Sequence, residues 1–360
     1  MIRWRKGTVQ DIRREWPGAV ELTVSIEGDG AHRAMAYPAL VGRPEPGDTV
    51  LLNTTALAMG LGTGGYAMVV AIPDRLPPDP TGPGHLVKAR YTPLQATVLG
   101  ADEQDSPHHD VLRDADSLDG MPVVVADLHS ALPPILAALL AERPSARVVY
   151  VMPDGGALPS WFSMSIARLK DAGALAATVT VGQAFGGDLE AVTVHTGLLA
   201  ARLILHADAV VLAQGPGNLG TGTRWGFSGV SAGEAVNAAS VLRGRPVASL
   251  RVSEGDRRER HVGVSHHSLT AYGRVALAPA DIPVPELGGP FGARVAAEAA
   301  PLGERHRLVP VPVDGLHETL RDAEKDWGVR LSTMGRRLDE DLAYFLTAAA
   351  AGRHTAALLG

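Results

Sequence analysis

The feature that most restricts the fold is a series of short apolar segments between residues 121 and 250, separated by segments with the composition of helices. Buried strands of a parallel sheet have continuous apolar sequences, and parallel neighbours need a crossover connection, usually a helix. The alternation therefore predicts an α/β fold with a doubly wound, mostly parallel sheet and helices on both faces. The predicted strands are residues 122–126, 147–152, 175–181, 208–213 and 246–250.

The segment before this region has a different pattern. Residues 20–26 alternate apolar and polar side chains, as a strand with one buried face does, and a turn with Gly28 and Gly30 follows. Several short strands between turns in residues 1–72 predict a small N-terminal β-barrel. We interpret the glycine- and threonine-rich residues 60–65 as a turn between barrel strands, with an anion-binding loop as the alternative.

Proline-rich stretches separate the parts of the chain. Residues 73–84 predict a linker, because proline interrupts helices and central strands. Later, residues 308–313 predict an edge strand, and residues 315–327 and 333–346 predict two closing helices. The predicted domains are a β-barrel-like domain with its linker at 1–84, an α/β ligand-binding domain at 85–305, and an edge strand with C-terminal helices at 306–360.

Two serines are predicted to begin helices as N-caps. Ser163 precedes a helix that ends before Gly173, and Ser231 with Glu234 has the spacing of a capping box. A serine hydroxyl in this position accepts a hydrogen bond from an otherwise unpaired backbone N–H group.

Composition excludes several classes of protein. With 46% hydrophobic and 20% charged residues, the chain is that of a folded globular protein. A net charge of −6 gives no reason to expect a nucleic acid partner, and the absence of cysteine excludes disulfides and thiolate chemistry. No apolar run approaches the roughly 20 residues of a membrane span, and no signal peptide is recognisable, so we expect no membrane association and a cytoplasmic protein.

Polar residues follow several of the predicted strands. Asp127 and His129 follow the first strand, Asp154 the second, Asp188 the third, and a glycine-rich loop the fourth. Ligands bind at the carboxyl ends of the strands in open parallel sheets, so this convergence predicts a shared site. The alternative is that each glycine makes a turn and each aspartate caps a helix.

The glycine-rich loop, residues 214–229, is the strongest single candidate for an anion-binding loop, because glycine lets backbone N–H groups approach a ligand. It lacks the Gly-Lys-Ser/Thr ending of a P-loop. Residues 215–220 have the Gly-x-Gly-x-x-Gly spacing of a dinucleotide-binding fold, but they come late in the series of strands and helices, where that motif is not expected. The alternative is an interdomain turn in which Trp225 and Phe227 pack. The predicted ligand-binding residues are Gly215, Gly217, Asn218, Gly220, Thr221, Gly222, Thr223 and Arg224.

Histidines and arginines are concentrated in residues 257–267. His266 and His267 can serve as acid or base, ligate a metal, or hold a phosphate beside the arginines. Histidines without cysteine or regular ligand spacing leave the metal unspecified. Asp256, Glu259 and the neighbouring arginines are interpreted as a salt-bridged surface.

Short motifs that are unusual in combination lie at residues 53–56, 62–65, 90–95, 127–130, 154–159, 186–191, 215–217, 220–223, 260–261 and 265–267. Together they resemble a bacterial family known as domain of unknown function 3866. The resemblance implies a bacterial, cytoplasmic protein and brings no activity.

The sequence therefore predicts a protein that binds a small anionic ligand, such as a nucleotide or phosphorylated metabolite, at the carboxyl edge of the sheet. If it is an enzyme, hydrolysis or group transfer is favoured, with Asp127, Asp154 or Asp188 as base or metal ligand and His266 or His267 as acid or base. His129 is the sixth predicted catalytic residue. No cofactor is specified. The alternative is a non-catalytic regulatory or assembly protein that forms a homodimer.

Overall fold

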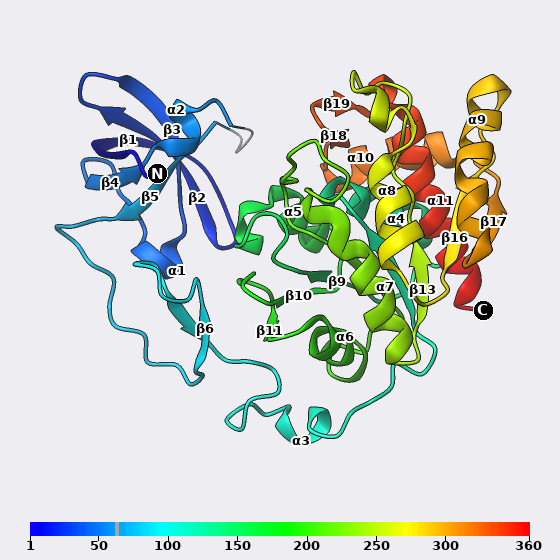
Figure 1. Cartoon of the computed structure of the whole chain (residues 1–360). Helices are drawn as coiled ribbons and strands as arrows, with labels where there is room; N and C mark the ends of the chain where they lie inside the picture. Colours follow the sequence, from blue (N-terminus) through cyan, green and yellow to red (C-terminus); the bar gives the residue numbers. More distant parts are fainter. Residues whose placement is uncertain (62–64) are drawn as a thin grey trace. The chain divides into compact units, whose positions relative to one another are not determined.

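The computed structural model describes residues 1–61 and 65–360 (Figure 1). Residues 62–64, within the predicted turn at 60–65, lie outside the described residues. The chain forms two compact units, Met1–Val98 and Leu99–Gly360. None of the described helices is long and apolar enough to cross a membrane.

The first unit contains a closed barrel, which confirms the predicted all-β segment. In its described residues the strand order is β1-β2-β3-β5-β4. Successive residues of a strand point to opposite faces, so the alternating pattern places Leu22 and Val24 in the barrel core. The strands are β1 (Trp4–Trp16), β2 (Ala19–Ile26), β3 (Gly30–Ala36), β4 (Thr49–Asn53) and β5 (Ala67–Ala71). Two short helices, α1 (Pro38–Val41) and α2 (Thr55–Ala58), and a hairpin of β6 (Leu86–Lys88) and β7 (Ala96–Val98) complete the unit.

The second unit is built on a parallel sheet, as the strand–helix alternation predicts. Its described strands follow the order β11-β10-β9-β12-β8-β13-β16-β17, and the neighbours pair in parallel. The predicted apolar segments form β8 (Pro122–Ala126), β9 (Val148–Met152), β10 (Ala177–Val181), β12 (Ala209–Ala213) and β13 (Arg245–Ala248). The predicted edge strand is β17 (Arg307–Val311).

Two strands of this sheet were not predicted. β11 (Leu189–Ala191) is short, and β16 (Asp281–Pro285) contains two prolines. Proline cannot donate a ladder hydrogen bond, so such a sequence argues against a strand inside a sheet. β16 nevertheless lies between β13 and β17, and it pairs with β13 only at Val247 and Asp281 among the described residues.

Helices cover both faces of the sheet (Figure 1). On one face, α6, α7 and α9 bury alanine, valine and leucine against Val123, Val125 and Val151. On the other face, α4, α5 and α11 pack against strand side chains that include Val124 and Tyr150. The helices are α3 (His109–Leu112), α4 (Leu132–Glu142), α5 (Met164–Asp171), α6 (Val194–Leu203), α7 (Ser231–Val241), α8 (His266–Thr270), α9 (Gly289–Ala299), α10 (Leu316–Trp327) and α11 (Leu342–Leu358).

The last predicted helix, residues 333–346, is wrong in position. Ser332–Thr333 and Arg336–Arg337 form a hairpin, β18 and β19, and α11 begins at Leu342. Met334 and Gly335 both have positive φ, at 47° and 82°, which is the geometry of a tight hairpin turn. The alanine-rich residues that follow extend the helix beyond the predicted end.

One of the two predicted caps is confirmed. The Ser163 hydroxyl accepts a hydrogen bond from the Ile166 N–H group at 3.1 Å. The prediction for Ser231 is wrong, because a 3-10 helix, Ser228–Val230, leads directly into α7. Ser231 is therefore already helical, and its hydroxyl donates to the Ser228 carbonyl.

The contact between α11 and α4 requires a glycine. A Cβ atom at Gly352 would overlap the carbonyl oxygen of Ile135, which belongs to the helix backbone and cannot rotate away. We expect Gly352→Ala to lower the free energy of unfolding by about 1–3 kcal/mol, although alanine is the better helix former. Urea denaturation measures this.

A matched control is Gly288→Ala, where an added Cβ meets nothing within 4 Å and φ is −71°. Its stability should stay within about 0.5 kcal/mol of wild type. If Gly352→Ala were as stable as this control, the close packing of α11 on α4 would be contradicted.

Candidate functional site

A cavity of about 220 Å³ lies where β8 and β12 end. The segments after these strands, with Ser165 of α5 and the β18–β19 hairpin region, form its wall. Arg330 is the charged residue of this wall, and no carboxylate is among its described lining residues. The lining residues are Leu128, His129, Ser130, Pro133, Ser165, Gln214, Gly215, Pro216, Gly217, Asn218, Arg330, Ser332 and Met334.

The first part of the predicted glycine-rich loop borders this cavity. Gly215, Gly217 and Asn218 line it, together with Gln214. The Gln214 amide donates to the Asp127 carbonyl at 2.6 Å and to Asn218 at 2.9 Å, while its buried Oε1 has no hydrogen-bond partner among the described residues.

Gly215 is required by packing as well. A Cβ atom there would lie 2.6 Å from the Ala157 carbonyl oxygen, and one at Gly156 would lie 2.7 Å from the Gly217 carbonyl. The loops after β9 and β12 therefore contact each other through their backbones. This close contact accounts for the glycines without any ligand.

The rest of the loop, residues 219–229, does not line the cavity. The Thr221 and Thr223 hydroxyls are 3.1 Å apart, and Thr223 also accepts from the Gly226 N–H group. Gly220, Gly222 and Arg224 belong to the same exposed turn, in which Gly222 has a φ of 79°. The hydroxyls predicted to contact an anion thus stabilise the turn itself.

His129 borders the cavity with both ring nitrogens in hydrogen bonds. Nδ1 lies 3.0 Å from the Tyr150 hydroxyl and Nε2 lies 2.7 Å from the Ser163 hydroxyl. Burial lowers the pKa of His129 to about 4, so the imidazole is neutral at pH 7. Because His129 is neutral and hydrogen-bonded at both ring nitrogens, it positions the β8–α4 connection and adds no charge to the cavity.

Asp127 lies next to the cavity wall, in a buried charged cluster. Its Oδ2 atom is 3.7 Å from Arg251 Nη1 and 3.4 Å from His267 Nδ1. Burial alone would raise the pKa of Asp127, but His267 and the charge of Arg251 outweigh this effect and lower it. Asp127 is therefore a carboxylate at neutral pH. A Cβ at Gly229 would lie 3.0 Å from the Asp127 Cβ, so that glycine leaves room for it.

Arg251 connects this aspartate to a second one. Its side chain is only 2% exposed, and Nη2 lies 3.7 Å from Asp256 Oδ2. Asp256 is also buried, so the interpretation of this aspartate as surface is wrong. Burial opposes its ionisation, but hydrogen bonds from Arg258 at 2.8–3.0 Å outweigh the penalty and lower the pKa of Asp256.

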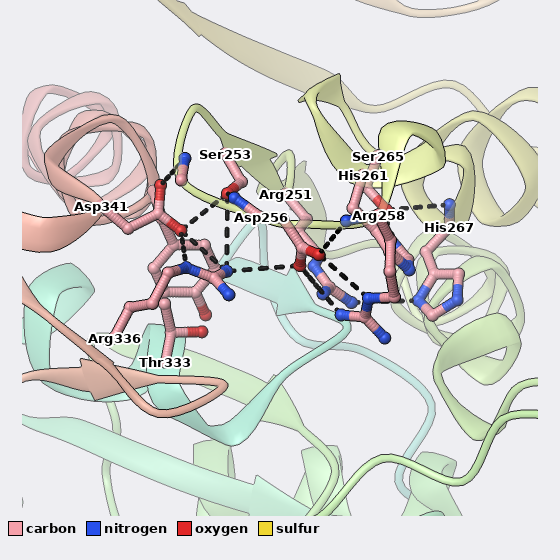
Figure 2. Close-up of polar contacts among 12 residues, drawn as sticks. Arg251, Ser253, Asp256, Arg258, His261, Ser265, His267, Thr333, Arg336 and Asp341 are labelled. Carbon is pink, nitrogen blue, oxygen red and sulfur yellow. Dashed lines mark hydrogen bonds and ion pairs between the residues drawn. The ribbon is translucent and has the colours of Figure 1, made fainter.

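The network continues to the start of α11 (Figure 2). Arg336 contacts both Asp256, at 3.3 Å, and Asp341, at 2.9 Å. Asp341 also accepts from the Ser253 hydroxyl at 2.7 Å. The sequence does not predict the roles of Arg336, Ser253 and Asp341, because nothing local in it indicates pairing across 88 residues, as between Ser253 and Asp341.

His266 and His267 lie together with His261. The ring centroids of the three histidines are 4.4–5.0 Å apart, and Phe227 stacks on His267 at 3.7 Å. Burial, with a smaller contribution from neighbouring positive charges, lowers the pKa of His261 to about 3 and of His266 to about 4. These two imidazoles are neutral at pH 7.

Asp154 and Asp188 lie apart from these groups. Asp154 is exposed and accepts from the Gln183 N–H group at 3.2 Å. Asp188 precedes β11 and accepts from the Thr178 N–H group at 2.7 Å and from Lys170. Because Thr178 is near the start of β10, Asp188 lies toward the amino ends of these strands, whereas Asp127 follows the carboxyl end of β8.

Residues 33–352 match the family described as Protein of unknown function (DUF3866). The chain belongs to this family. The DUF3866 match runs from β3 to α11 and so includes the cavity, the charged cluster and the three histidines. No curated protein and no solved structure is detectably similar to the chain.

The charged cluster generates a stability prediction. Arg251→Met would leave the buried Asp127 carboxylate without its cation, and breaking a buried pair in this way costs about 3–5 kcal/mol. We expect a loss of this size in urea denaturation. The exposed Arg113, which pairs with Asp110 and Asp114, gives the control: Arg113→Met should cost less than about 1 kcal/mol. Equal effects of the two changes would show that Arg251 is not needed to balance the buried charge.

The lowered pKa of His129 generates a second prediction. Between pH 6.5 and 4 an unfolded chain binds a proton at this histidine and the folded chain does not, so folding stability falls as the pH falls through this window. His129→Gln should reduce the difference in free energy of unfolding between pH 7 and pH 5. His261 and His266 titrate in the same direction, so a smaller difference should remain. Identical pH dependences of wild type and His129→Gln would contradict the assignment.

Proposed function

We propose that this protein binds a small anionic ligand, specifically a phosphorylated metabolite, in the cavity at the carboxyl ends of β8 and β12. The observation that carries the proposal is the charge of the wall, in which Arg330 faces no carboxylate among the described lining residues. An arginine without a carboxylate beside it is available for a phosphate or carboxylate ligand.

The side chains around Arg330 support the same ligand chemistry. Arg330 and Ser332 are exposed, Ser165 is partly exposed, and none of the three makes a side-chain hydrogen bond within the described residues. Their hydroxyl and guanidinium groups are donors to phosphate oxygens. Pro133 and Pro134 carry no N–H group, so the first turn of α4 adds little to anion binding.

The size of the cavity restricts the ligand. Its volume of about 220 Å³ is below the roughly 300–1,000 Å³ of pockets for drug-sized molecules. A sugar phosphate or a phosphorylated acid fits this volume better than a dinucleotide does. A dinucleotide is also disfavoured by the turn at Gly220–Arg224, which does not border the cavity.

Binding has more support than catalysis. Of the six residues predicted to be catalytic, only His129 lines the cavity, and both its nitrogens are hydrogen-bonded to the protein. The proposal is therefore limited to ligand binding.

The alternative, a non-catalytic assembly protein, is supported by a separate observation. Leu219 and Trp225, on the exposed part of the glycine-rich loop, are 70% and 54% exposed. Two large apolar side chains exposed on one loop are a feature of protein contact surfaces.

Thermal unfolding with a panel of ligands tests the proposal. The panel contains inorganic phosphate, sugar phosphates, mononucleotides and dicarboxylates. A ligand at about 100 times its dissociation constant stabilises the folded state by about 2.7 kcal/mol. We expect a sugar phosphate or related compound to raise the melting temperature, and Arg330→Gln to weaken its binding about 10–100-fold, because a hydrogen bond to a charged group contributes about 1.5–3 kcal/mol.

The matched control is Arg337→Gln, which removes the same charge from the neighbouring hairpin without touching the cavity. Its ligand response should equal that of wild type. If no panel member stabilises the protein, or if both variants respond alike, the cavity is not the binding site. The assembly alternative would then be favoured if light scattering shows that wild type is a dimer and that the double variant with Leu219→Ser and Trp225→Ser is a monomer.

A further inference from the structure

His261, His266 and His267 lie close together and are not among the described lining residues of the cavity. His261 ends the 3-10 helix Glu259–His261, and His266 and His267 begin α8. One ring nitrogen from each of the three lies within 4.8 Å of the corresponding nitrogen of the other two. The ring planes are inclined by 44–88°, so the rings converge as a tripod and do not stack.

The Nδ1 atoms of two of these rings have polar neighbours within the protein. His261 Nδ1 lies 2.7 Å from the Ser265 hydroxyl. His267 Nδ1 lies 3.4 Å from Asp127 Oδ2 and 3.2 Å from Arg251 Nη1. In the tautomer with the proton on Nδ1, His267 donates to the Asp127 carboxylate and keeps the lone pair of Nε2 for a ligand. Figure 2 shows His261 and His267 with these neighbours Ser265 and Arg251. An imidazole whose Nδ1 is fixed by an oxygen or carboxylate presents Nε2 in a set direction, as histidine ligands of metals do.

His266 supplies the third donor. Its Nε2 atom is shielded from solvent and has no hydrogen-bond partner among the described residues. Leaving a buried polar atom without a partner is unfavourable, so this atom calls for a bound species. The imidazoles of His261 and His266 are neutral at pH 7, so each keeps a lone pair available.

We propose that His261, His266 and His267 bind a divalent transition-metal ion, with Zn²⁺ the ion that this ligand set fits best. Imidazole nitrogen is a ligand for zinc and its neighbours in the first transition row, whereas Mg²⁺ and Ca²⁺ prefer oxygen. Asp127 and Ser265 act as positioning residues that orient His267 and His261. Three protein ligands leave a fourth coordination position open.

The charges around the tripod are compatible with a cation. The Arg251 charge is opposed by Asp127 and Asp256, and Arg258 is paired with Asp256. Arg260 directly precedes His261 in the 3-10 helix. Its charge beside a bound cation favours an anion in the open coordination position.

Titration of the full chain with Zn²⁺ tests this inference. After EDTA treatment and buffer exchange, calorimetry should give one Zn²⁺ per chain for wild type. His266→Gln should weaken binding at least 100-fold, and the exposed His195→Gln on α6 should leave it unchanged. Asp127→Asn should weaken it about 10–100-fold through the orientation of His267.

Two further measurements separate metal binding from a structural role of the histidines. Without metal, His266→Gln should melt at the wild-type temperature, and Zn²⁺ should raise the melting temperature of wild type alone. Co²⁺ in place of Zn²⁺ should give the visible absorption of a tetrahedral nitrogen-ligated ion in wild type, and none in the variant. This spectrum uses wild type, so it decides the question even if the variant fails to fold.

The inference would be overturned by wild type that takes up no Zn²⁺, by equal affinities of wild type and His266→Gln, or by a Co²⁺ spectrum of the hexaaqua ion. In that case the histidines serve packing, with a water molecule as the partner of His266.

Discussion

The second unit depends on the way it accommodates one buried cation, the guanidinium group of Arg251. Removing such a charge from water costs several kcal/mol, which only nearby opposite charges can offset. Asp127 and Asp256 supply them from different segments, one after β8 and the other after β14 (Val252–Ser253). Because Asp256 also holds Arg336, the requirement extends to the hairpin before α11. One buried arginine thus fixes three segments that are far apart in the sequence.

Asp127 belongs to two arrangements at the same time. Its backbone carbonyl accepts from Gln214, which forms the cavity wall, and its carboxylate faces His267 in the histidine tripod. Any shift of this residue would therefore be transmitted to both places. Asp127 therefore connects the cavity with the histidine tripod, although the cavity suits an anion and the tripod suits a cation.

Much of the fold could be predicted from the sequence, because apolar runs and helix patterns are local signals. The barrel, the parallel sheet and the cap at Ser163 are of this kind. β16 could not be predicted, because its prolines argue against a place inside the sheet. The predicted start of the last helix is too early, because the Met334-Gly335 turn has no clear signal in the sequence and α11 begins only after it. The location of the candidate site at the carboxyl ends of β8 and β12 follows from the topology of the sheet. The pairing of Arg251, Asp256 and Asp341 does not, because it depends on which distant charges the folded chain brings together.

The position of Asp341 has a consequence for how the protein forms during synthesis. Arg336 and Asp341 come after all the strands of the large sheet, yet they complete the partners of Asp256 and Ser253. A ribosome adds residues from the amino end, so the sheet can pair while this part of the charged network is still missing. Until residues 336–341 emerge, Ser253 and Asp256 lack these partners. The centre of the unit is therefore finished late, after the framework around it already exists.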